Sequence, residues 1–153
     1  MGGDGPNAES VGMSLDIDIL ETTFDLIAPR GDELMDEFYS RLFEAAPGVR
    51  PLFPDDMRKQ KTMLLGALVL VRKSLRDLDR LVPTLHAMGA RHVGYGAKPE
   101  YYPVVGGALI DAMAAVAGDA WTPEIEQAWA GAYAVVAGAM IDGAEQAELA
   151  EAA

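Results

Sequence analysis

The sequence predicts an all-α fold, on the strength of three observations. Apolar residues recur at spacings of three and four along most of the chain, which is the period of a helix. Ala, Leu, Met, Glu and Asp dominate the composition, whereas the apolar–polar alternation of a half-buried strand is scarce. Proline and glycine interrupt the apolar pattern between the helical segments. We therefore expect about seven helices, no strands and no internal repeat.

The first half of the chain divides into three helices and one corner. Ser14 is expected to cap the first helix, which ends at the Ala-Pro-Arg-Gly sequence of residues 28–31. The second helix spans about residues 32–46 and carries two adjacent apolar rows, which indicate burial over a wide arc. Prolines between residues 47 and 54 forbid a long helix there and predict a tight corner. A third helix follows over about residues 56–75.

The second half predicts three more helices. After a turn at residues 77–80, a helix closes at His92, where a Gly-Tyr-Gly sequence breaks it. The next helix covers about residues 98–118, with proline at a first-turn position. Thr122, followed by proline and two acidic residues, is a strong start signal. That last helix continues to about Glu148.

Length and charge bound the class of protein. A chain of 153 residues is expected to form one domain with a sizeable core. We place that domain at residues 14–148, between a disordered leader (1–13) and a frayed tail (149–153). A net charge of −12 disfavours partners such as nucleic acid or an anionic membrane. No apolar stretch reaches the ~20 residues of a membrane span, and the leader lacks a signal-peptide layout, so we expect a cytoplasmic protein.

His92 is the strongest candidate for a metal ligand. The chain holds two histidines and no cysteine, which excludes disulfides, zinc–thiolate sites and iron–sulfur clusters. Leu85, Met88 or Gly89, and His92 share an apolar helical face, so the imidazole should point into the protein. A lone inward histidine is more often a satisfied core residue than a ligand, and the spacing leaves both interpretations open. His86 is expected to lie at the surface or in helix packing, and is a ligand only in another helix register.

Six side chains that can ligate, donate to or pack against a bound group occur in a fixed order: Tyr39, Phe53, Gln60, Leu64, His92 and Tyr102. This order resembles the globin family, and more closely the bacterial globins of the flavohaemoglobin type and their single-domain relatives. The resemblance spans roughly residues 14–148. It is carried by the segments Phe38–Phe43, Val49–Phe53, Arg91–Val93 and Tyr102–Gly106.

On the distal side, the resemblance implies a globin fold, three helices over three, around haem b. Tyr39 is then the distal tyrosine, Gln60 the distal polar residue, and Leu64 closes the pocket above the iron. Phe53 packs on the haem at the corner. A hydrogen-bond donor such as the Tyr hydroxyl or Gln amide stabilises bound oxygen by roughly 1.5–3 kcal/mol. Without the family context, Tyr39 is more simply a core residue and Gln60 part of a solvated helix face.

On the proximal side, the resemblance implies that His92 is the iron ligand and that Tyr102 supports it; Tyr101 is the alternative that only the family alignment sets aside. Arg91 could pair with a haem propionate or simply lie exposed at a helix end. Met57 or Met63 could approach the iron as a sixth ligand, although helical methionine is far more often core.

One position departs from the family pattern. In flavohaemoglobin-type globins a carboxylate on the last helix contacts the proximal histidine and the neighbouring tyrosine. Counted without a gap from Tyr133, that position is Ala144, with Glu145 next to it. One residue is a rotation of about 100° on a helix, so Glu145 should not reach the histidine. The expected acceptor for His92 is therefore a backbone carbonyl.

The function implied by the resemblance is reversible binding of O2, NO and CO, for oxygen storage or transport or for NO detoxification. NO dioxygenation needs a reductase, and no glycine-rich dinucleotide motif follows a strand, so we expect a separate flavin reductase. A haem-based gas sensor and a non-haem helical interaction module are the alternatives. The chain is expected to be a monomer or a homodimer, with no nucleic acid and no membrane as partner.

Overall fold

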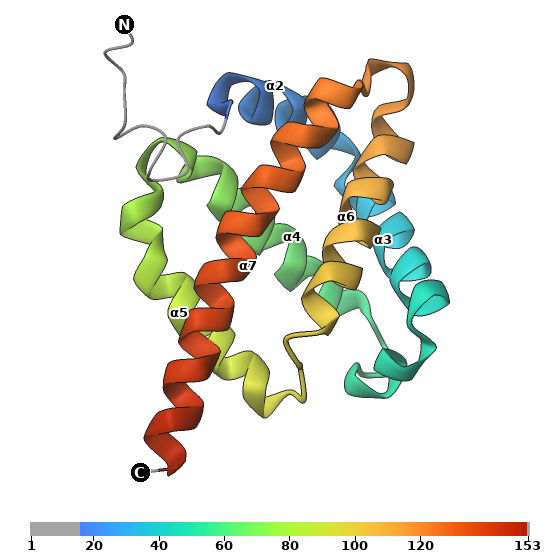
Figure 1. Cartoon of the computed structure of the whole chain (residues 1–153). Coiled ribbons are helices and arrows are strands. Elements are labelled where there is room, and N and C mark those ends of the chain that lie inside the picture. Colours follow the sequence, from blue (N-terminus) through green and yellow to red (C-terminus); the bar gives the residue numbers. More distant parts are fainter. Residues whose placement is uncertain (1–15, 153) are drawn as a thin grey trace, which may run out of the picture.

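The computed structural model describes residues 16–152, and these residues form helices joined by short connections, without a strand. The all-α prediction is confirmed (Figure 1). The α-helices are α2 (Ile17–Ile27), α3 (Gly31–Ala45), α4 (Arg58–Lys73), α5 (Leu78–Gly94), α6 (Tyr101–Ala117) and α7 (Pro123–Ala152). Short 3-10 turns connect them at η1 (Ala28–Arg30), η2 (Pro47–Leu52), η3 (Leu75–Asp77) and η4 (Gly118–Ala120).

Helix α2 begins at a different cap from the one expected. Ser14 lies outside the described residues, and Asp16 is the N-cap, since its Oδ1 accepts a hydrogen bond from the Ile19 backbone N–H at 3.1 Å. The start signal at Thr122 is confirmed, because its Oγ1 accepts from the Ile125 N–H at 3.2 Å. Both caps satisfy a backbone donor that the first helical turn leaves free.

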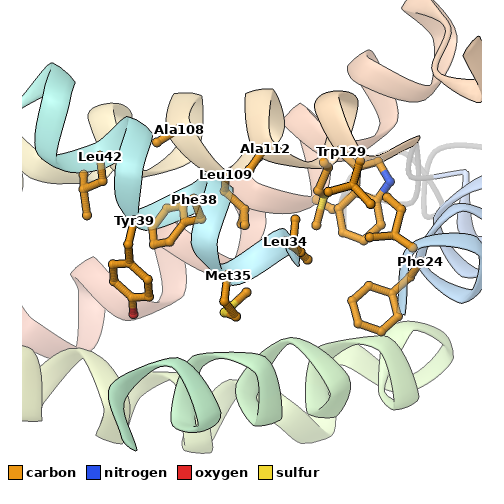
Figure 2. Close-up of a cluster of buried hydrophobic side chains, with 14 of the residues drawn as sticks. Phe24, Leu34, Met35, Phe38, Tyr39, Leu42, Ala108, Leu109, Ala112 and Trp129 are labelled. Atoms are coloured by element: carbon orange, nitrogen blue, oxygen red, sulfur yellow. The ribbon is translucent and has the colours of Figure 1, made fainter. Parts of the chain in front are cut away.

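Helix α3 carries the two buried rows that the sequence predicts. Leu34 and Phe38 lie on the side of α6, near Leu109, whereas Met35 and Tyr39 point towards α4 (Figure 2). All four α3 side chains are nearly fully buried. The helix therefore has one face in the main core and an adjacent face that looks onto α4.

Several helix boundaries differ from the sequence-based ones. Helix α5 begins at Leu78, so most of the turn expected at residues 77–80 is helical. Pro83 is tolerated inside it because the missing N–H leaves only one carbonyl near the helix start without its usual donor. Helix α6 begins only at Tyr101, and α7 continues past Glu148 to Ala152.

Helices α5 and α7 cross almost backbone to backbone (Figure 1). A Cβ atom on Gly89 would overlap the backbone carbonyl of Met140, and one on Gly143 would overlap the backbone of His86. Glycine is required at both positions because any side chain would force the helices apart. The crossing fixes the course of α5 towards His92 at its last turn.

Helix α6 is the most apolar helix described. The segment Tyr101–Ala120 is long and apolar enough to span a membrane, by length and composition only, contrary to our expectation that no stretch would be. Leu109 and Ala112 of this helix are buried in the main core cluster with α3 (Figure 2). Met113 and Val116 belong to the same cluster. Packing within the fold therefore accounts for the apolar composition of these positions.

Candidate functional site

Tyr39 and Gln60 form a polar pair between α3 and α4. Tyr39 is 4% exposed, and Gln60 lies in the first turn of α4. Gln60 Nε2 donates a hydrogen bond to Tyr39 Oη at 3.1 Å. Because Oη accepts this bond, the hydroxyl hydrogen of Tyr39 stays available for another acceptor. The pair can therefore offer one O–H donor to a ligand.

Three phenyl rings hold Tyr39 in place. The ring centroids of Phe38, Phe43 and Phe53 lie 4.7, 5.8 and 5.7 Å from that of Tyr39. Phe38 and Phe53 meet it edge to face, which is a favoured arrangement of aromatic rings. The Arg50 guanidinium lies 5.0 Å from the centroid of the Phe43 ring and donates to the Phe53 carbonyl at 3.2 Å. The proline corner thus fixes Phe53 beside Tyr39.

The surroundings of Tyr39 keep its hydroxyl protonated. Burial raises the pKa of Tyr39 above its ordinary value, and the hydrogen bond from Gln60 offsets part of that rise. Leu64, one turn after Gln60 on α4, is half-buried and packs against the main core. The α3–α4 side of the site therefore presents the neutral Tyr39 hydroxyl as a hydrogen-bond donor in apolar surroundings.

His92 is oriented by its own helix. Its Nδ1 lies 2.6 Å from the backbone carbonyl oxygen of Met88, one turn earlier. A carbonyl oxygen can only accept, so Nδ1 is the donor in this bond, and the neutral tautomer that fits the bond has its lone pair on Nε2. Tyr95 packs edge-on against the imidazole, with 5.5 Å between ring centroids. A histidine with one nitrogen held by an acceptor and the other free has the arrangement of a metal ligand.

Tyr102 contributes a buried hydroxyl. Among residues 16–152, its Oη has no hydrogen-bond partner, while its backbone carbonyl accepts from Tyr133 Oη at 2.7 Å. Burial raises the pKa of both tyrosines above the ordinary value. Tyr102 packs with Met88 against the buried cluster of α5 and α7, next to the turn that orients His92. A buried hydroxyl without a partner is costly, which favours a further group near this position.

These residues fit a haem group better than a bare metal ion. Residues 16–152 contain no group of three or more His, Cys, Asp or Glu side chains placed to hold an ion. A single imidazole suffices when a porphyrin supplies the remaining in-plane ligands of iron. A large apolar group that carries one metal could be held by these residues. His92 would offer Nε2 to the metal, Phe53 would pack against the apolar group, and the Tyr39–Gln60 pair would donate a hydrogen bond to a ligand on the metal.

Arg91, Glu145 and His86, which the sequence analysis also considered, make none of the hydrogen bonds or ring contacts described above. Arg91 is exposed on the last turn of α5. Glu145 is exposed while Ala144 is half-buried, as the rotation of one helical residue requires. His86 is half-buried, and its backbone packs against Gly143. The side chain of Glu145 therefore faces solvent.

The two methionines considered as sixth ligands differ in burial. Met57 is half-buried and packs against the main core cluster, whereas Met63 is 58% exposed on α4. The core contact of Met57 is that of an ordinary packed side chain, and the exposure of Met63 is that of a surface residue. Neither observation indicates an iron ligand. The proposal of a sixth side-chain ligand therefore has no structural support from these two positions.

Sequence reasoning missed three residues that position the site. Tyr133 bonds the Tyr102 carbonyl, Arg50 bonds the Phe53 carbonyl, and Tyr95 covers the edge of His92. In the structure Gly106 leaves room for Tyr133, since a Cβ there would stand 2.5 Å from the Tyr133 ring, but a glycine inside a helix does not name its partner in the sequence. The sequence carries no signal for Arg50 or Tyr95 either, because their contacts depend on how the corner and the helix end fold back.

A helical fold with a Tyr–Gln donor pair in apolar surroundings, and with an imidazole whose Nε2 has no partner among residues 16–152, is typical of a haem-binding protein of the globin class. The Globin family model matches residues 36–140. The chain belongs to the globin family, as the resemblance in the sequence implied.

Individual relatives support this assignment. The chain is 36% identical over 139 residues to the flavohemoprotein of Bacillus subtilis, a match that covers 86% of this chain and 35% of that protein. A bacterial globin from Campylobacter jejuni superposes with a TM-score of 0.76 at 26% identity, covering 85% of this chain and 94% of that one. The flavohemoglobin of Malassezia yamatoensis, which holds FAD and heme, has the same fold, with a TM-score of 0.68 at 24% identity over 85% of this chain and 36% of that one. The chain spans about a third of the length of the curated relatives it matches.

Proposed function

We propose that this globin binds O2 reversibly and uses it to convert NO to nitrate. The observation that carries the proposal is the hydrogen bond from Gln60 Nε2 to Tyr39 Oη, which leaves the Tyr39 hydroxyl free to donate. Haem, when bound, supplies the iron that holds the diatomic ligand and exchanges an electron with it. A donor fixed beside that ligand stabilises the partial negative charge which O2 gains on binding.

The chain's own residues divide the remaining tasks. His92 would hold haem through Nε2, with its Nδ1–H donated to the Met88 carbonyl. Phe53 and Leu64 would pack on the haem faces and keep water from the ligand. The raised pKa of Tyr39 keeps its proton in place at neutral pH, so that it donates a hydrogen bond without losing the proton. We assign haem b, because the chain has no cysteine for covalent attachment of a c-type haem.

The proposed reaction joins O2, NO and one electron to give nitrate. The electron would come from a flavin reductase outside residues 16–152, in keeping with the similarity to flavohemoproteins. A purely reversible oxygen carrier is the second candidate. It is favoured by the neutral carbonyl acceptor of His92, because a carbonyl makes the imidazole a weaker electron donor than a carboxylate does. We place either activity in the cytoplasm.

Absorption spectra and rapid mixing test the proposal. The haem-loaded protein should show a Soret band that shifts on reduction and again on CO addition. Mixing its oxy form with NO should give nitrate and ferric protein within the mixing time. A protein that takes up no haem, and so shows no Soret band, would overturn the whole proposal. Slow autoxidation with no NO-dependent reaction would leave the oxygen carrier.

A further inference from the structure

A groove lies between α3 and α4, and its lining includes Met35, one helical turn before Tyr39, and Lys61, the neighbour of Gln60. It has a volume of about 710 Å³. Its lining includes three apolar side chains, Met35 from α3 and Leu65 and Val69 from α4, while Asp36 and Lys61 belong to its charged rim. Asp32 and Arg58 line it as well, so the groove combines an apolar part with four charged side chains along the two helices that carry the polar pair.

The two helices are in contact near this groove at two places. A Cβ on Gly31 would stand 2.7 Å from Leu65 Cδ2, and Leu65 itself lines the groove. About two turns further along α3, Gln60 donates to Tyr39. The α3 residues that line the groove, Asp32, Met35 and Asp36, therefore lie between these two contacts.

One exposed ion pair joins α3 and α4 across the rim of the groove. Lys61 Nζ and Asp36 Oδ1 are 2.8 Å apart, and their side chains are 34% and 68% exposed. Such exposed ion pairs contribute little, because water and salt screen them. On the α4 side, a Cβ on Gly66 would meet no atom within 4 Å, so the wall there is open. Small molecules can therefore reach the apolar lining without the fold having to open.

Met35 lies along α3 between the groove that it lines and Tyr39. It is 1% exposed, lies one turn before Tyr39 and points with it towards α4 (Figure 2). Methionine has three rotatable bonds and adapts its shape at little cost. A change of its side-chain rotamer would extend the groove along α3 towards Tyr39, and an unbranched or γ-branched side chain changes rotamer more easily than a β-branched one.

We propose that this groove is the route by which neutral diatomic ligands reach the site, with Met35 as its movable wall. The inference rests on the proposed function, since it needs a diatomic ligand at Tyr39. A neutral diatomic molecule loses almost no hydration energy on entering an apolar passage, whereas an ion such as nitrate would. The apolar part of the groove thus favours the neutral ligands over the anionic product.

The test is CO association after flash photolysis of the haem-loaded protein. Thr62→Trp should fill the groove mouth, since Thr62 lines the groove and its hydroxyl bonds only the Arg58 carbonyl of its own helix among the contacts found. We expect bimolecular CO association to slow by about tenfold, with the equilibrium CO spectrum unchanged. Leu70→Trp is the matched control, because Leu70 is 41% exposed on the same helix outside the groove.

A second pair of variants tests the wall itself. Met35→Ala should speed association and Met35→Leu, which keeps the volume, should retain most of the rate. Wild-type rates in both Thr62→Trp and Met35→Ala would overturn the route. So would a rate that responds only to Gln60→Ala, because ligands would then pass the Gln60 side chain directly. A protein without a CO-shifted Soret band would instead refute the proposed function, so the two failures are distinguishable.

Discussion

Gln60 Nε2 donates to Tyr39 Oη across the α3–α4 contact, and the direction of this bond decides what the site can do. Because the Tyr39 oxygen already accepts this bond from Gln60, the Tyr39 hydroxyl hydrogen points away from Gln60 and can be donated to a ligand. The rise in the Tyr39 pKa on burial keeps that hydrogen in place. Gln60 therefore orients the Tyr39 hydroxyl as a donor.

Replacing Tyr39 by Phe should raise the O2 dissociation rate by about 10- to 100-fold. The variant keeps the ring contacts with Phe38 and Phe53 but removes a hydrogen bond worth roughly 1.5–3 kcal/mol to a partly charged ligand. Stopped-flow displacement of O2 by CO measures the rate. Gln60→Leu should have a smaller effect in the same direction, because it removes only the group that orients the hydroxyl. An O2 release rate equal to the wild type in Tyr39→Phe would exclude the hydroxyl as the donor.

Replacing His92 by Ala should abolish stable haem uptake, whereas His86→Ala should leave it intact. His92 has a free Nε2 and an acceptor on Nδ1, while His86 lies two turns earlier with its backbone packed on Gly143. Haem titration followed at the Soret band, together with circular dichroism to confirm the fold, distinguishes them. Normal uptake by His92→Ala, or loss in His86→Ala alone, would transfer the ligand role to His86.

Features that depend on local sequence were predicted well. The two buried rows of α3, the proline corner, the Thr122 cap and the break after His92 follow from spacing and from backbone preferences of proline and glycine. The backbone carbonyl that was expected as the acceptor for His92, because Glu145 should not reach it, is that of Met88, four residues earlier on the same helix. These relationships span at most a few turns of one helix.

Features that depend on contacts between helices were not predicted. The backbone contact at Gly89 could not be read from the sequence, since a helical glycine looks the same whether or not another helix covers it. The Tyr133 bond to the Tyr102 carbonyl joins residues 31 apart and needs the packing of α6 on α7. Asp16 replaced Ser14 as a cap because either residue suits the position chemically.

Introducing Glu at Ala144 should strengthen the bond between iron and the proximal histidine. The position is half-buried on α7, and it is the one at which the resemblance to flavohaemoglobin-type globins places the carboxylate that contacts the proximal histidine and the neighbouring tyrosine. Tyr102 Oη is buried without a partner among the described residues, which fits a missing acceptor. A carboxylate acceptor makes an imidazole more basic than a carbonyl does. Resonance Raman of the ferrous protein should show a higher iron–histidine stretching frequency, and the reduction potential should fall. Glu145→Ala is the control and should change neither; a shift in that variant would mean that the exposed Glu145 acts on the site.

Tyr133→Phe should destabilise the protein near neutral pH and flatten its loss of stability in alkali. It removes a hydrogen bond to the Tyr102 carbonyl worth about 0.5–1.5 kcal/mol. Burial raises the folded-state pKa of Tyr133 above its ordinary value of 10.0. Above pH 10 the unfolded chain therefore binds fewer protons than the folded one, so the free energy of unfolding falls as pH rises.

Urea unfolding measured between pH 7 and pH 11 checks both parts of the Tyr133 prediction. The wild-type curve should drop above pH 10, and the drop should be smaller in Tyr133→Phe. Tyr95→Phe serves as the control because Tyr95 is 58% exposed, so its removal should leave the alkaline drop unchanged. Identical alkaline slopes in wild type and Tyr133→Phe would show that Tyr133 ionises alike in both states.

Replacing Gly89 by Ala should destabilise the fold by about 1–3 kcal/mol, against the normal helix preference for alanine. A Cβ at this position would overlap the Met140 carbonyl, and a backbone atom cannot move aside as a flexible side chain can. Gly138→Ala is the matched control, since a Cβ there meets nothing within 4 Å and should stabilise α7 by roughly 0.5–1 kcal/mol. Urea unfolding of the apo-globin gives both values. Because the crossing directs α5 towards His92, Gly89→Ala should also weaken haem retention, measured by transfer to a haem-scavenging protein. A stability and retention equal to those of Gly138→Ala would mean that α5 and α7 separate at no cost, and that another contact sets the position of His92.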